Sequence, residues 1–340
     1  MRQVWLPYVD CLVCLVCLML VGHGHGHELF HTDGAWAVLE DGGVTTWGDP
    51  ARGGDSSAVE EELTSGVVRV FATMGAFSAL KSDGSVISWG KASEGGSSSN
   101  LHRVVKLAAS AHAFAALRED GSVTFWGSIG NELSFDELNQ EQSRSNHFLY
   151  LQPKVMPQED LMHLIADVVD VVASTDSFAC LKQDGTIYEW DGDVLDKVCD
   201  SAGSSIHQLV GGYFSFAALR SDGSVCTWGH SEFGGSPHGV AQDLQNGVLK
   251  LEQRSIFDRG FVAWKANATA VIWGHNPKGV PLESQVVHAR EVQLRHRAGV
   301  VLRTNGSAFS FGDPKTFGDS SGIDLTNIKQ ILCPRFTCVA

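Results

Sequence analysis

One sequence unit recurs seven times along the 340 residues, and it constrains the fold more than any other feature. The unit reads AFSALKSDGSVISWG in its second copy and SFAALRSDGSVCTWG in its fifth. Five of the six intervals between successive copies span 37 to 45 residues, and one spans 64. A period of this size predicts repeats that each pack against their neighbours. The aromatic residues that close the seven copies are Trp47, Trp89, Trp126, Trp190, Trp228, Trp273 and Phe311.

Each copy has the pattern of a β-hairpin. A short apolar run meets a turn dipeptide, and a second run rich in Val, Thr and Ile follows. Asp-Gly and Asn-Gly tolerate the positive φ of a type I′ turn, so we expect that turn type. The sixth copy carries Asn267-Ala268, which predicts a strained turn or another turn type. The remaining turn dipeptides are Asp41-Gly42, Asp83-Gly84, Asp120-Gly121, Asp184-Gly185, Asp222-Gly223 and Asn305-Gly306.

A further apolar run precedes the hairpins, for example Val67 to Ala72 and Val104 to Ala108. Each repeat therefore supplies at least three strands, and radial stacking of such sheets buries both of their faces. The predicted fold class is all-β, a seven-bladed β-propeller built from seven repeats of about 40 residues. The six repeated tryptophans are expected to fill equivalent buried positions between blades. Residues 328–340 look like the start of an eighth unit, which either helps to close the ring or belongs to a longer product.

The pattern F-A-x-L-x-x-D-G-x-V-x-x-W-G resembles the regulator-of-chromosome-condensation repeat, from about Leu29 to the C-terminus. This resemblance implies a seven-bladed propeller. The family includes exchange factors for small GTPases, substrate-binding modules of giant ubiquitin ligases and a secreted bacterial inhibitor of β-lactamase. The loops after Trp-Gly depart from the family, because they read Gly-Gly-Asp-Ser-Ser and similar sequences instead of Gly-Gln-Leu-Gly. The chain therefore resembles a divergent subfamily, and exchange activity is not carried over.

The N-terminal residues 1–27 form a separate segment, and residues 28–340 form the propeller. Residues 11–22 carry no charge and have the length of a signal-peptide core. A cleaved signal, a membrane anchor and a misassigned start of a soluble protein remain three alternatives. The secretory pathway is favoured, with the cytoplasm as the alternative. The alternating His23, His25 and His27 could hold a metal ion, although a flexible tract without metal is the favoured interpretation.

Composition excludes one class of partner. The chain has 25 Lys and Arg against 39 Asp and Glu, a net charge of −14. Binding to nucleic acid requires surplus cations to neutralise phosphates, so we expect no nucleic-acid partner. We expect a monomer that binds a protein through one loop face, uses no cofactor, and meets a membrane only through an uncleaved N-terminal segment.

The 64-residue interval contains an insertion at about 128–166, and loops on rigid scaffolds often carry binding residues. The candidate partner contacts in it are Asp136, Glu137, Phe148 and Tyr150. Two loop carboxylates, Asp55 and Asp319, are further candidates. The segment 318–322 matches the G-x-S-x-G motif, but it repeats the loop of the first copy and no His follows it. We therefore expect no catalytic residues.

Two modification patterns remain. Asn267 and Asn305 begin glycosylation sequons on hairpin turns, where turn chemistry also favours Asn. Cys180, Cys226 and Cys338 fall on expected strands, where a free thiol acts as a small buried apolar group. A disulfide framework is not evident.

The sequence thus predicts a non-catalytic scaffold or recognition module, with a nucleotide exchange factor or a ubiquitin-ligase recognition propeller as the alternative.

Overall fold

The computed structural model describes most of the propeller. The described residues are 28–97, 101–128, 166–192, 195–199, 203–237, 239–253, 259–266, 268–274, 284–295, 298–312, 325–329 and 331. They form seven antiparallel sheets of three or four strands, each built from consecutive strands. We number these sheets as blades 1 to 7, and the predicted all-β fold with seven blades is confirmed.

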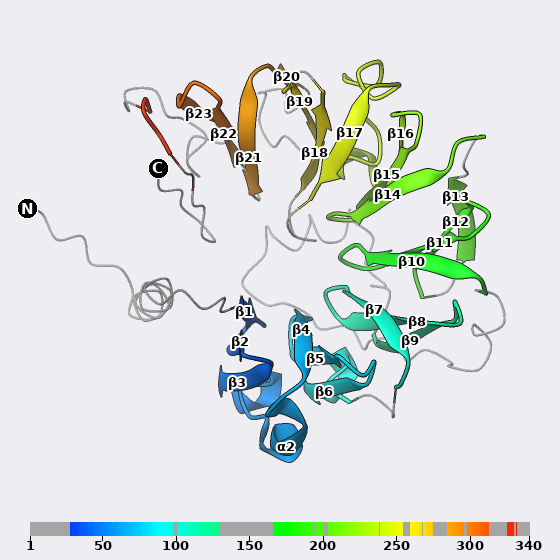
Figure 1. Cartoon of the computed structure of the whole chain (residues 1–340), viewed down its shortest axis with the longest axis vertical. Helices are drawn as coiled ribbons and strands as arrows, with labels where there is room; N and C mark the ends of the chain where they lie inside the picture. Colours follow the sequence, from blue (N-terminus) through cyan, green and yellow to red (C-terminus); the bar gives the residue numbers. More distant parts are fainter. Residues whose placement is uncertain are drawn as a thin grey trace, which may run out of the picture.

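Every blade follows the same order from the centre outward (Figure 1). The inner strands are β1 (Glu28–His31), β4 (Val67–Ala72), β7 (Val104–Ala109), β10 (Val168–Ala173), β14 (Ile206–Gly211), β17 (Val248–Glu252) and β21 (Ala289–Arg295). The middle strands are β2 (Ala35–Glu40), β5 (Ala76–Lys81), β8 (Ala113–Arg118), β11 (Phe178–Lys182), β15 (Ser215–Arg220), β18 (Gly260–Lys265) and β22 (Ala298–Arg303). The next strands are β3 (Gly43–Gly48), β6 (Val86–Gly90), β9 (Val123–Gly127), β12 (Ile187–Trp190), β16 (Val225–Gly229), β19 (Ala270–Gly274) and β23 (Ala308–Gly312).

Blades 4 and 6 add a fourth strand, β13 (Leu195–Cys199) and β20 (Ser284–Val286). Short helices lie in the loops after the third strands. They are η1 (Pro50–Arg52), η2 (Ser57–Val59), α2 (Glu60–Leu63), η3 (Ala92–Glu94) and η4 (Ser231–Phe233). No helix in the described part of the chain is long and apolar enough to cross a membrane.

Backbone hydrogen bonds join neighbouring blades at both ends of the inner strands. At one end, the Met74 N–H donates to the Ala111 carbonyl at 2.7 Å, and the Ala111 N–H donates to the Thr175 carbonyl at 2.9 Å. At the other end, the first residue of an inner strand donates to the turn of the preceding blade, as Val104 does to Gly84 at 2.9 Å. Such bonds satisfy backbone groups that would otherwise be unpaired at the strand ends.

The arc of blades has two ends in Figure 1, blade 1 in blue and blade 7 in orange, and they do not lie side by side. Beyond blade 7, the Ile328 N–H donates to the turn glycine Gly306 at 2.8 Å, as the first residues of other inner strands do. Asn327 has a φ of 61°, close to the φ of Arg103 and Asp167 before their inner strands. The described residues 327–329 therefore begin as an eighth repeat would.

The hairpin turns differ from the expected type I′ except in blade 1, where Asp41 and Gly42 have φ values of 50° and 79°. The blade 2 turn is one residue longer. The Gly84 N–H donates to the Lys81 carbonyl at 3.0 Å, and only Gly84 has positive φ. This is a three-residue loop in which glycine takes the left-handed position of a bulge. In the sixth copy Ala268 has a φ of 56°, so the expected strain at that turn is confirmed.

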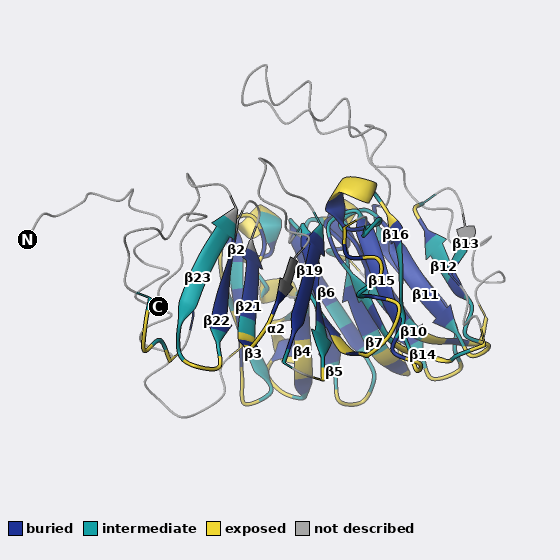
Figure 2. Cartoon of the chain, turned by 90° about the horizontal axis from the view of Figure 1, so that it is seen from above, coloured by how far each residue is buried: buried dark blue, intermediate teal, exposed yellow. Residues whose placement is uncertain are grey.

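Five of the repeated tryptophans are buried as predicted, with exposed fractions from 0 to 8% for Trp89, Trp126, Trp190, Trp228 and Trp273. The prediction is wrong for Trp47, which is 37% exposed. Among the described residues no blade precedes blade 1, whereas each of the five buried tryptophans lies in a blade that follows another. Figure 2 shows buried residues along the strands and exposed ones mainly at their ends.

The cysteine interpretation is correct at one position and wrong at another. Cys180 is a buried free thiol, and burial raises its pKa to about 12. Cys226 is not free, because it forms a disulfide with Cys199. This bond joins β16 of blade 5 to β13 of blade 4, and the strand pattern alone did not reveal it. Cys338 lies outside the described residues.

Candidate functional site

The propeller has two faces on which a partner could bind. The hairpin turns, such as Asp83-Gly84, lie on one of them, which we call the turn face. The connections from inner to middle strands and the loops after the third strands lie on the opposite one, the loop face. Both faces are rimmed by exposed residues, whereas the strands between them are mostly buried (Figure 2).

On the turn face, the inner strands of blades 2 to 7 share a β-bulge at the same position. The pairing of β4 with β5 shifts between Val67 and Arg69, and the other five inner strands shift at the corresponding point. A bulge places one unpaired extra residue in the strand. The extra residues are Val68, Val105, Val169, His207, Leu249 and Arg290.

Four of the six bulge residues are apolar and exposed. We call Val68, Val105, Val169 and Leu249 the apolar ring; their exposed fractions are 53, 53, 54 and 61%. The valine before each of them is buried, with exposed fractions of 3 or 4%. Repeated exposed apolar side chains on one face indicate an interaction surface. The signal in the sequence was a pair of adjacent apolar residues at the start of these four inner strands, which breaks strand alternation.

Charged side chains of both signs adjoin the apolar ring. Lys106 of blade 3 pairs with Asp170 of blade 4, and the Lys250 ammonium lies 3.8 Å from the Glu252 carboxylate. Farther out, Asp83 accepts hydrogen bonds from the Ser85 hydroxyl and N–H, at 2.6 and 2.9 Å, which hold the pKa of its carboxyl below the usual value. Asp120 and its serine repeat this arrangement. The carboxylates of Asp83 and Asp120 at the rim of the turn face are therefore ionised at neutral pH.

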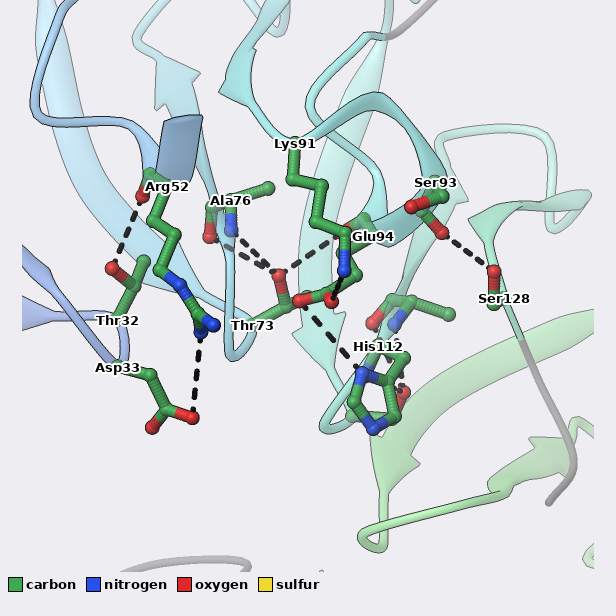
Figure 3. Close-up of polar contacts among 12 residues, drawn as sticks. Thr32, Asp33, Arg52, Thr73, Ala76, Lys91, Ser93, Glu94, His112 and Ser128 are labelled. Atoms are coloured by element: carbon green, nitrogen blue, oxygen red, sulfur yellow. Dashed lines mark hydrogen bonds and ion pairs between the residues drawn. The ribbon is translucent and has the colours of Figure 1, made fainter. Parts of the chain in front are cut away.

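On the loop face, hydroxyl groups fix the loops after the third strands (Figure 3). The Thr73 Oγ1 accepts from the Ala76 N–H at 3.0 Å and donates to the Glu94 carbonyl at 3.0 Å. Thr32 makes the equivalent bonds to Ala35 and Arg52 in blade 1. These contacts attach each loop to its own blade.

A buried carboxylate lies at this rim between blades 2 and 3 (Figure 3). The Glu94 side chain is 5% exposed; the Lys91 Nζ donates to its Oε1 at 2.5 Å, and the His112 Nδ1 lies 3.8 Å from its Oε2. Burial raises the pKa of Glu94, but the contacts with His112 and Lys91 outweigh it and leave the pKa below its usual value. The Glu94 carboxylate therefore contacts Lys91 of its own blade and His112 of blade 3.

Two further acids lie in blade 4. The Ser174 hydroxyl donates to Asp176 at 3.0 Å, the Ser177 hydroxyl donates to Glu189 at 2.8 Å, and the two hydroxyl groups are 2.8 Å apart. Burial raises the pKa of Asp176 to about 6 and that of Glu189 to about 7. Within the described ranges, no group of three His, Cys, Asp or Glu residues is arranged to hold a metal ion.

Of the site residues predicted from the sequence, the structure describes only Asp55 and Asn305. The Asp55 Oδ1 accepts from the Ser57 N–H at 2.9 Å, so this exposed carboxylate caps its own loop. Asn305 lies on an exposed turn, where its Oδ1 accepts from the Ser307 N–H at 2.9 Å. The structure does not bring these two residues together, and neither is in the apolar ring. The other predicted site residues lie outside the described residues; they are Asp136, Glu137, Phe148, Tyr150, Asp319, His23, His25, His27 and Asn267.

Comparison with known proteins adds only distant likenesses. No model of a known family and no curated protein matches the chain. Human WBSCR16 is 18% identical with a TM-score of 0.37, covering 60% of this chain and 62% of its own. Prp20p from Saccharomyces cerevisiae is 17% identical with a TM-score of 0.44, covering 88% and 75%. The ectodomain of the Physcomitrella patens receptor kinase CR4 is 13% identical with a TM-score of 0.44, covering 84% and 72%. Likenesses at this level assign neither a family nor a partner.

Proposed function

We propose that this protein is a non-catalytic scaffold that binds a protein partner through the apolar ring on its turn face. The observation that carries the proposal is the repeated β-bulge, which turns Val68, Val105, Val169 and Leu249 outward. The preceding valines already fill the core at these positions, so packing within the blades does not require the bulge residues. Contact with a partner would explain why these exposed side chains are apolar.

The surroundings of the ring suit a protein interface. Protein interfaces combine an apolar centre with a polar, solvent-accessible rim. Here the apolar ring belongs to the inner strands, and the ionised Asp83 and Asp120 lie in the turns between the middle and third strands, farther out in their blades. A partner that covers the ring would remove four half-exposed apolar side chains from water, which favours association.

Charge substitutions in the ring test this proposal. Val68→Asp combined with Val105→Asp should lower the affinity for the protein partner at least tenfold. The reason is that binding would bury two carboxylates without a partner charge, which costs free energy. Thr45→Asp, on exposed β3, is the matched control and should capture as well as the parent. The far-ultraviolet circular dichroism of the variants should equal that of the parent. Equal capture by the ring variant and the control would contradict the proposal.

Nucleotide exchange on a small GTPase is a more specific alternative function. It is an activity found in the family that the sequence resembles. It predicts faster release of labelled GDP from a small GTPase in the presence of this protein. A ligase-recognition role predicts instead the binding of a substrate without an effect on GDP. Both activities require a protein-binding face, so the capture experiment comes first.

A further inference from the structure

The hairpin turn of blade 7 carries an asparagine where blades 1 to 5 carry an aspartate. The Asn305 Oδ1 accepts from the Ser307 N–H at 2.9 Å and from the Ser307 hydroxyl at 2.8 Å. In blade 2 the same two bonds join Asp83 to Ser85. An aspartate at position 305 would therefore form the same turn, and the fold does not require an amide there.

The fold leaves the amide nitrogen of Asn305 unused. Both bonds of this side chain go to its oxygen, and within the described part of the chain its Nδ2 has no hydrogen-bond acceptor. Asn305 is exposed, and the neighbouring chain contacts the turn through Gly306, whose carbonyl accepts from the Ile328 N–H at 2.8 Å. A large group on Nδ2 would therefore break no hydrogen bond, and it would leave from an exposed residue on the turn face.

The turn also carries the sequence that such a group requires. Asn305, Gly306 and Ser307 form the acceptor sequence for an N-linked oligosaccharide, which needs Asn, any residue but Pro, and then Ser or Thr. The required hydroxyl is the one that donates to the Asn305 amide at 2.8 Å. The folded turn therefore keeps the amide and the hydroxyl in contact.

The Cys199–Cys226 disulfide is an independent indication of the compartment. It joins β13 of blade 4 to β16 of blade 5. Disulfides persist in secreted proteins and in the lumen of the endoplasmic reticulum, and they are rare in the cytosol. Asparagine is glycosylated in the same oxidising pathway. The uncharged run at residues 11–22 favours this pathway on separate grounds.

We propose that Asn305 is an N-glycosylation site, with an oligosaccharide linked to a lipid diphosphate as the donor. The Nδ2 atom forms a bond to the anomeric carbon of the first sugar, and the bond from that carbon to the diphosphate oxygen breaks. The lipid diphosphate leaves, and the amide nitrogen gives up one proton. The sugar then lies on blade 7, whose bulge residue is Arg290, so the site is separate from the apolar ring.

Peptide mapping of the full chain tests the site. The chain is expressed with its own residues 1–27 in a eukaryotic cell that glycosylates proteins, and trypsin releases Asn305 in the peptide 304–315. Peptide N-glycosidase in heavy-oxygen water converts an asparagine that carried sugar into a labelled aspartate. We expect label at position 305 in most copies of this peptide. A digest without the glycosidase controls for spontaneous deamidation of the Asn-Gly pair.

Substitutions in the turn separate the sugar from the fold. Ser307→Ala removes the required hydroxyl and should abolish the label, whereas Ser307→Thr should retain it. Asn305→Asp reproduces the turn of Asp83, so it should lose the sugar and keep the circular dichroism of the parent. Equal label in the parent and in Ser307→Ala overturns the proposal, as does label confined to the peptide 266–278, which holds the other sequon.

Asp83→Asn is the matched positive control, because it creates the same Asn-Gly-Ser sequence in the equivalent turn of blade 2. We expect label at both positions, and label at position 305 upholds the proposal with or without label at position 83. Label at position 83 alone overturns it, because the transferase then reaches the chain but does not modify the blade 7 turn. Label at neither position also overturns it. Capture through the apolar ring is unaffected by these results, since Asn305 is not part of the ring.

Discussion

The indole N–H of Trp89 donates to the carbonyl oxygen of Gly53, 3.0 Å away in the preceding blade. This bond joins two features of the sequence repeat, the closing tryptophan of one copy and the first glycine of the Gly-Gly loop in the copy before it. It explains why the loop needs glycine, since any side chain at position 53 would overlap the Phe77 ring. The repeat therefore encodes the contact between blades as well as the blades themselves.

The burial of the tryptophans predicts different costs for identical substitutions. Trp89→Ala should lower the free energy of unfolding by about 3–5 kcal/mol, because it leaves a cavity and an unpaired Gly53 carbonyl. Trp47→Ala should lower it by less than about 1 kcal/mol, because its side chain is partly solvated. Urea unfolding followed by circular dichroism measures both values. Equal costs would contradict the difference in packing between blades 1 and 2.

Two turn glycines separate the cost of backbone strain from the cost of a collision. Gly84 has a φ of +77°, and a Cβ on it would lie 3.1 Å from the Val104 nitrogen. Gly203 has a φ of +87°, and no atom lies within 4 Å of its Cβ position. Gly203→Val should cost about 1–2 kcal/mol through φ alone, and Gly84→Val should cost more. Thermal unfolding of the two variants decides this, and a larger loss at Gly203 would refute it.

The two buried acids of blade 4 should make the protein less stable as pH rises. Their pKa values are about 6 for Asp176 and about 7 for Glu189 in the folded protein, above the ordinary values of 3.8 and 4.5. The folded state therefore holds more protons between about pH 4 and 7, and the free energy of unfolding falls across this window. Below it, this stability is fully present; above it, it has been lost.

Glu189→Gln isolates this effect. The amide oxygen still accepts from Ser177 but cannot ionise, so the variant should be more stable than the parent by about 2 kcal/mol at pH 8 and equal to it near pH 4. Glu61→Gln, on exposed α2, is the control and should follow the parent at both pH values. A parallel pH profile for the parent and Glu189→Gln would show that burial does not shift this carboxyl.

The Cys199–Cys226 bond joins blades 4 and 5 across a separation of 27 residues. Removing it with Cys199→Ser should cost about 2–4 kcal/mol under oxidising conditions, because the crosslink restricts the unfolded chain. A reducing agent should lower the melting temperature of the parent but not that of the variant. Cys180→Ala, at the buried free thiol, should leave the response to reductant unchanged. Two free thiols at positions 199 and 226 in the oxidised parent would refute the bond.

Much of the fold followed from the sequence because the repeat carries redundant information. Seven copies of one hairpin predicted seven blades, and the positive φ of Ala268 was expected from the missing glycine. The turn type was mistaken because Ser82 lengthens the loop by one residue, which places only Gly84 in the left-handed region. A pattern of dipeptides does not distinguish these two hairpins.

The candidate surfaces were harder to predict than the blades. The sequence pattern places Val68 in an apolar strand, and only the register shift beside it shows that its side chain leaves the core. Trp47 matches its counterparts in sequence, and its exposure depends on which blade stands before it. The four proposed contacts in the insertion at 128–166 all lie outside the described residues. The exposure of Val68 and Trp47 therefore depends on strand register and neighbouring blades, which the repeat pattern does not encode.

The β-bulge itself predicts opposite results for two adjacent valines. Val67 is 4% exposed and packs in the core around Phe77, whereas Val68 is 53% exposed. Val67→Asp would bury an unpaired carboxylate and should lower the free energy of unfolding by more than about 3 kcal/mol. Val68→Asp should change it by less than about 0.5 kcal/mol, because that side chain is already in water. Val104→Asp and Val105→Asp should repeat the contrast in blade 3. If Val68→Asp destabilised the protein as strongly as Val67→Asp, the bulge residue would belong to the core, and the apolar ring would lose its role as a binding surface.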